Sequence, residues 1–197
     1  MMYFGQRYCI ALLLLLIIMP VIAFCEPDVI EQTRYYNVEG DSPQSIRQSM
    51  NTQRRMFVKG GYDAYVSWFL AWRFRYDDDL KGCKINTVST KLKVRYILPR
   101  WVGGERSSSK ILIATKARWQ KYYAALLEHE HGHRDWGINA ATAIEQRLLA
   151  MPYARDCLSL RRDAQSLAVR VLANYLRREK HYDRDTRYGA TQGAVFP

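Results

Sequence analysis

The stretch His129-Glu130-His131-Gly132-His133 places two histidines four positions apart, with a glutamate directly after the first. Positions i and i+4 share one face of an α-helix, so His129 and His133 can direct their imidazoles at one metal ion. Glu130 is rotated by about 100° from His129, where it can take a proton from water bound to that metal. The stretch matches the H-E-x-x-H pattern of zinc peptidases and predicts a zinc site with Glu130 as the general base.

The residues around this motif predict a long amphipathic helix. From about Thr115 to Met151 the chain has no proline and is rich in alanine and leucine. One stripe recurs at spacings of three and four, and it consists of Tyr122, Leu126, His129, His133, Trp136, Ala140 and Ile144. Both histidines therefore lie on the inward face, where an imidazole without a partner is costly. A shared metal ion would satisfy them, and hydrogen bonds to backbone or carboxylate groups are the alternative.

A second helix is predicted after Pro152, from Leu158 to about Lys180, with many arginines on its outer side. The short turn between the two helices makes them antiparallel neighbours. Because both helices rise by about 1.5 Å per residue, equal counts from the turn bring residues 179–185 beside the motif. We therefore expect the C-terminal segment to lie next to His129 and His133.

A catalytic zinc ion takes three protein ligands and leaves one position for water. Glu145 has a separation suited to a helix that breaks after the second histidine, but an unbroken helix carries it about 18 Å beyond His133. The C-terminal segment supplies the other candidates, which are His181, Asp183, Asp185 and Tyr188. Of these we favour Asp183 as the third ligand, ahead of Asp185.

The chain before the motif has the pattern of a sheet with one face in water. Apolar residues alternate with lysines and arginines, and the predicted strands are 33–38, 64–76 and 88–98. A short helix from Ser42 to about Arg55 follows the first strand, a bulge is expected near Thr87, and Pro99 ends the last strand. The predicted fold class is α+β, with a small antiparallel sheet and a short helix packed on two long antiparallel helices, the first of them zincin-like.

Residues 1–25 have the features of a signal peptide. Arg7 is basic, residues 10–19 are uninterruptedly apolar, and Pro20 precedes small residues at a cleavage site. Phe24 disfavours Cys25 as a lipid anchor. We expect a periplasmic or secreted protein with a single domain at 26–197, in which 26–114 is mainly sheet and 115–197 is helical and holds the metal site. In that oxidising location Cys83 and Cys157 are a candidate disulfide pair.

The full chain has a formal net charge of +11. An exported protein rarely meets nucleic acid, so we expect no nucleic-acid partner. Anionic surfaces of the cell envelope are the partners that this charge favours, besides a peptide or protein substrate.

Several motifs occur together and in a defined order along the chain. They are Tyr36-Asn37-Val38-Glu39-Gly40, Gly82-Cys83, Leu98-Pro99-Arg100-Trp101, residues 119–123 leading into 129–133, Tyr182-Asp183 with Thr186, and the ending 192–197. In this order the chain resembles the bacterial predicted secreted zinc-dependent proteases, a domain family of unknown function. The resemblance implies zinc at His129 and His133, with Glu130 as base. The family pattern has a histidine where this chain has Tyr188, so either Tyr188 substitutes as a weak ligand or a neighbour such as Asp183 or His181 completes the site.

Two hypotheses of different classes follow. The first is an exported zinc metallopeptidase in which Glu130 assists the attack of water on a peptide bond. The second is a catalytically inactive envelope protein that keeps the fold for binding or scaffolding, which the departure at Tyr188 and the positive charge favour.

Overall fold

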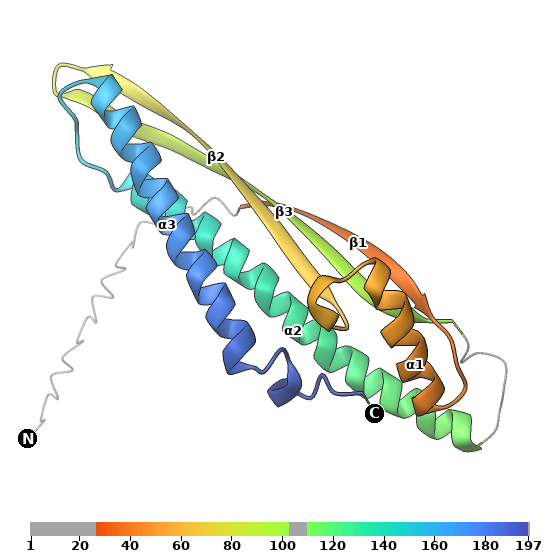
Figure 1. Cartoon of the computed structure of the whole chain (residues 1–197). Helices are drawn as coiled ribbons and strands as arrows, with labels where there is room; N and C mark the ends of the chain where they lie inside the picture. The colour runs from red at the N-terminus through yellow and green to blue at the C-terminus, as the bar shows by residue number, and fades with distance from the viewer. Residues whose placement is uncertain (1–26, 103–109, 197) are drawn as a thin grey trace, which may run out of the picture.

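The computed structural model describes residues 27–102 and 110–196. Figure 1 shows a long twisted sheet lying along two long antiparallel helices. The strands are β1 (Asp28–Val38), β2 (Tyr65–Asp79) and β3 (Gly82–Trp101), and the helices are α1 (Pro43–Gln53), α2 (Lys110–Leu149) and α3 (Cys157–Asp185). Three short 3₁₀ helices complete the fold, η1 (Arg54–Met56), η2 (Lys59–Gly61) and η3 (Ala190–Gln192). The expected signal peptide lies outside the described residues.

The sheet is mixed, and the expectation of a purely antiparallel sheet is wrong. Its strand order is β1-β3-β2, with β2 antiparallel to β3 and β1 parallel to β3. The connection through α1 starts β2 at the end of the sheet where β1 finishes, so β2 runs against β1. The hairpin turn then reverses the chain again, and β3 pairs with β1 in the same direction. The sheet is therefore mixed because the third strand, not the second, lies beside the first.

The register of the hairpin contains the expected bulge. Arg75 pairs with Thr87 and Tyr76 with Ile85, which leaves Asn86 as the extra residue. Pro99 does not end β3, which continues to Trp101. Pairing with β2 reaches only as far as Ile97, while pairing with β1 goes on to Trp101. Pro99 is thus bordered by a strand on one side only, a position where the missing N–H is tolerated.

The two faces of β3 differ as the alternation predicts. Leu92, Val94 and Tyr96 are buried, and α2 and α3 pack along this face of the sheet (Figure 1). Lys91, Lys93 and Arg95 are exposed on the opposite face. At Gly137 of α2, a Cβ atom would lie 3.0–3.2 Å from Leu92 side-chain atoms, so the absence of a side chain lets the helix pack closely on the sheet. No helix within the described ranges is long and apolar enough to span a membrane.

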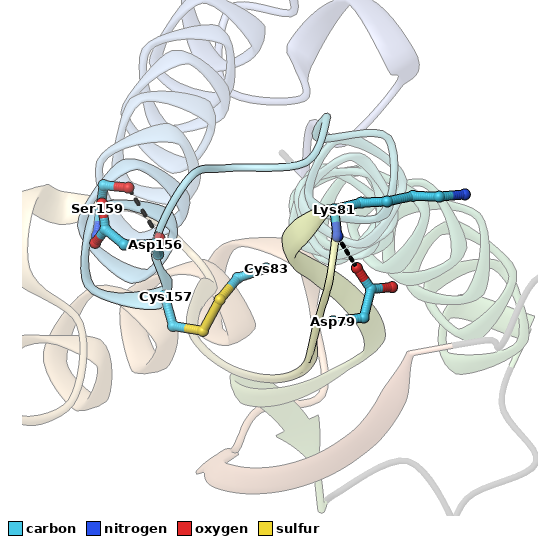
Figure 2. Close-up of a disulfide and its surroundings, with 6 residues drawn as sticks. All are labelled: Asp79, Lys81, Cys83, Asp156, Cys157 and Ser159. Carbon is cyan, nitrogen blue, oxygen red and sulfur yellow. Dashed lines mark hydrogen bonds between the residues drawn. A yellow bond between two sulfur atoms is a disulfide. The ribbon is translucent and has the colours of Figure 1, made fainter.

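A disulfide joins the sheet to the helical pair at one end of the molecule. Cys83 and Cys157, the candidate pair, are bonded across 74 positions of sequence, as Figure 2 shows. The Cys83 and Ala154 backbones also exchange two hydrogen bonds of 2.9 Å. Asp156 caps α3 by accepting the backbone N–H of Ser159 at 2.8 Å. The β2–β3 turn and the α2–α3 turn are therefore held together (Figure 2).

The chain folds back on α2 after α3 ends. Arg187 and Tyr188 have φ of 50° and 55°, and Gly189 follows at 81°. These left-handed conformations reverse the chain direction and lead into η3. Phe196 is then buried against Trp119 and Tyr122 of α2. The C-terminal segment is thus part of the core.

Candidate metal centre

Two histidines of α2 and one aspartate of α3 converge on one point. Asp183 Oδ1 lies 3.4 Å from Nε2 of His129 and 2.9 Å from Nε2 of His133. The three potential ligand atoms of this group all lie within 4.8 Å of one another. The antiparallel packing of α2 on α3 produces this arrangement, as equal counting from the turn predicts. Of the four candidates in the C-terminal segment, Asp183 is the residue that the fold places between the two imidazoles.

The Nδ1 atom of each imidazole also has an oxygen partner. His129 Nδ1 donates to Oε1 of Gln192 at 2.9 Å, and His133 Nδ1 lies 3.4 Å from Oε1 of Glu179. Glu179 in turn accepts the indole N–H of Trp68 at 2.9 Å, which connects this site to β2. Because both Nδ1 atoms have oxygen partners, both Nε2 atoms face the space beside Asp183 and are available to bind a metal ion. This is the arrangement by which proteins orient histidine ligands of metals.

Close packing around His129 requires glycine at two positions, Gly132 and Gly189. The Tyr182 ring stacks on the His129 ring at 5.1 Å and 15°. A Cβ atom on Gly132 would lie 2.2 Å from the Tyr182 hydroxyl, so only glycine allows this approach. Gly189 is also close to the motif, since a Cβ atom there would lie 3.0 Å from Cγ of His129. Glycine at both positions therefore lets the C-terminal segment reach His129.

The charges at the centre reinforce one another. Burial alone lowers the pKa of His133, but hydrogen bonds to Asp183 and Glu179 outweigh it and raise the pKa to about 9. Burial raises the pKa of Asp183, and the hydrogen bonds from His129 and His133 reverse this and hold it well below its usual range. Asp183 is therefore a carboxylate at neutral pH, the form in which it can bind a cation.

Glu130 is buried on the same helix beside the two histidines. Burial raises its pKa to about 7; the nearby His133 and His129 oppose the shift and Asp183 adds to it. A carboxyl group with a pKa near 7 exchanges protons efficiently at neutral pH. This is the property that a general base requires.

A cavity of about 490 Å³ opens onto these groups. Its lining includes His129, Glu130, His133 and Asp183, together with residues of the β2 entry and of the segment after α1. Tyr188 lies on its wall with its ring 4.5 Å from that of Tyr62. A cleft with convergent polar groups and perturbed pKa values is the usual form of a ligand site.

The other residues considered as the third ligand lie away from the two imidazoles or have other partners. His181 is exposed and accepts a hydrogen bond from Arg184 at Nδ1, and Asp185 is exposed at the end of α3. Glu145 is buried further along the unbroken α2 and accepts the Thr90 hydroxyl at 2.7 Å. The site residues predicted from the sequence include neither Gln192 nor Glu179. Glu179 lies within residues 179–185, which the equal rise of the two helices places beside the motif. No sequence pattern indicates Gln192, because the turn after α3 brings it to His129.

Fold and site together define a small α+β protein with a two-histidine, one-carboxylate cluster where two antiparallel helices meet. Residues 33–189 match the family described as bacterial protein of unknown function (DUF922), and the chain belongs to this family. No curated protein and no solved structure matches the chain.

Proposed function

We propose that the protein is an exported zinc-dependent peptidase. The observation that carries the proposal is the convergence of His129, His133 and Asp183 beside a buried Glu130, at the wall of a cavity. Export is supported by the features of residues 1–25 and by the Cys83–Cys157 disulfide, since such bonds persist in oxidising compartments.

The donor set fits zinc. Two imidazole nitrogens and one carboxylate oxygen are a ligand set of catalytic zinc sites, which leave a further position open. The hydrogen bonds from both Nδ1 atoms to Gln192 and Glu179 hold the Nε2 atoms toward the common point. Zinc bound by these residues would supply polarisation of a carbonyl group and a lowered pKa for water.

The protein groups then divide the work of hydrolysis. Glu130 accepts the proton of the attacking water and passes it to the leaving amine. Burial supports the first step, because it raises the pKa of Glu130 in the metal-free protein to about 7 and so favours proton uptake by its carboxylate. The cavity holds the peptide beside Glu130 and the zinc-binding residues. Glu179 and Gln192 keep the two imidazoles in place.

The test compares Glu130→Gln with Glu128→Gln, a matched change at an exposed glutamate of the same helix. Both zinc-loaded variants and the native protein are incubated with a peptide library, and cleavage is followed by mass spectrometry. We expect Glu130→Gln to keep one zinc ion and to lose at least about 100-fold in rate, because it removes the general base. Glu128→Gln is expected to retain activity. Equal rates for the native protein and Glu130→Gln would refute the mechanism, and stoichiometric zinc with no cleavage by the native protein would favour the non-catalytic hypothesis.

A further inference from the structure

One end of the cavity is built around the carboxylate of Asp63, whose side chain is 14% exposed. Arg47 Nη1 donates to both carboxylate oxygens, at 2.7 and 2.9 Å. Arg54 Nη1 donates to Oδ1 at 2.6 Å, and the Tyr122 hydroxyl donates to Oδ2 at 2.8 Å. One carboxylate therefore faces two guanidinium groups, and this partly buried cluster carries an excess positive charge.

The two arginines of this cluster are used differently. Arg47 also donates from Nη2 to the Phe196 carbonyl at 2.9 Å, so both of its terminal nitrogens have partners. Arg54 uses only Nη1, and its Nε and Nη2 make no hydrogen bond to any residue that the structure describes. Its side chain is 21% exposed and lines the cavity. Arg54 thus presents spare donors and a charge at a position where its side chain is already held by Asp63.

A carboxylate is the group that such donors fit. The planar guanidinium offers parallel N–H groups that match two carboxylate oxygens, and partial desolvation strengthens the pairing. Lys180 adds a further cation to the lining of the same cavity. Four acidic residues also line this cavity. Asp63 is held by the arginines, and Glu179 by Trp68 and His133. Asp183 contacts both imidazoles, and Glu130 is the proposed general base, so none of the four is a free partner for Arg54.

We infer that Arg54 binds a carboxylate of the substrate, so that the cavity selects peptides with an aspartate or glutamate at one fixed position. This inference rests on the proposed function and names its substrate class. The carboxylate belongs to a side chain, and a peptide C-terminus, which has the same chemistry, is distinguished in the test.

The experiment measures binding, so that it does not depend on turnover. Zinc-loaded Glu130→Gln protein is titrated with fluorescent ten-residue alanine-rich peptides, amidated at the C-terminus, that carry one glutamate or one glutamine at each position in turn. At one position we expect the glutamate peptide to bind about tenfold more tightly than its glutamine twin, because a site built for a charged partner rejects the analogue that lacks it. Peptides with a free C-terminus and no acidic side chain form a separate arm.

The control is Arg55, an exposed arginine of the same η1 helix that is not part of the cavity lining. Adding Arg54→Gln should abolish the tenfold difference, whereas adding Arg55→Gln, with the same loss of charge, should preserve it. Arg54→Lys keeps the charge opposite Asp63 but not the planar fork, and should lose the greater part of the preference. Its melting temperature and zinc content check that the fold is intact.

Equal affinity of the glutamate and glutamine twins at every position would overturn the inference, as would a preference that survives Arg54→Gln. A preference confined to free C-termini would overturn the assignment to a side chain. Cleavage assays on the native protein separate this result from the proposed function. Cleavage without acidic preference refutes the carboxylate site alone, and acidic preference without any cleavage refutes the peptidase alone.

Discussion

At the scale of single residues, two residues of one motif have raised pKa values for different physical reasons. Burial raises the pKa of Glu130 to about 7, whereas hydrogen bonds to Asp183 and Glu179 raise the pKa of His133 to about 9. The difference arises because His133 meets two carboxylates directly, while Glu130 is desolvated beside groups that only partly compensate. In the metal-free protein His133 is therefore an imidazolium paired with Asp183 at neutral pH.

This pairing predicts how the stability of the metal-free protein depends on pH. The pKa of His133 is higher in the folded state than in the unfolded chain, so its contribution is complete below about pH 6.5 and is lost as pH rises through about 9. We expect the melting temperature of chelator-treated protein to fall by roughly 5 °C over that window. His133→Gln should lack this fall, and His131→Gln should show it. A native profile that matches that of His133→Gln would contradict the prediction.

At the scale of elements, the turn after α3 completes the candidate metal centre. Arg187, Tyr188 and Gly189 adopt left-handed conformations, and η3 then directs Gln192 at His129 Nδ1. Gln192 Nε2 also donates to the Tyr182 hydroxyl at 3.1 Å, so the turn contacts α3 and α2 at once. The short C-terminal element thus positions His129, a candidate ligand that belongs to another helix.

Zinc affinity tests this role of the turn, measured by competition with a chelator. Gln192→Ala should weaken binding by about 10- to 100-fold, because the His129 ring loses the hydrogen bond that orients it. Asp183→Asn should weaken binding further, since it removes a charged ligand. Gln120→Ala and Asp185→Asn, at exposed positions, are the matched controls and should leave affinity unchanged. Equal affinity of Gln192→Ala and the native protein would exclude the positioning role.

At the scale of the whole molecule, the disulfide and the candidate metal centre lie at different places along the helical pair. The disulfide holds the β2–β3 turn to the α2–α3 turn (Figure 2), whereas His133 lies about 24 Å back along α2 from its end. The sheet and helices between the two ends are joined by a continuous apolar core that includes Leu92, Ile144 and Leu148. The cross-link therefore acts on folding without touching the site.

Loss of the disulfide should lower stability but not zinc affinity. Replacing both Cys83 and Cys157 with serine is expected to cost about 2–4 kcal/mol, because the unfolded chain gains the freedom of a long loop. The melting temperature should fall by about 5–15 °C. Reductant should lower the native melting temperature similarly and leave the double variant unaffected. An unchanged melting temperature, or a parallel loss of zinc affinity, would contradict this separation of roles.

The sequence by itself determined the features that depend on local periodicity. The four-residue spacing places His129 and His133 on one helical face, alternation gives the wet and buried faces of β3, and equal helix rises bring Asp183 to the motif. Only the tertiary structure decided the features that depend on distant segments. The parallel pairing of β1 with β3 follows from the path of the chain through α1, and Gln192 reaches His129 through a turn with left-handed backbone. The free donors of Arg54 likewise depend on the tertiary structure, in which Arg47 donates to both carboxylate oxygens of Asp63 and Arg54 donates to only one. No short pattern encodes the β1–β3 pairing or the His129–Gln192 contact, because both join residues that are far apart along the chain. The contacts of Arg54 depend on how the segment after α1 folds around Asp63.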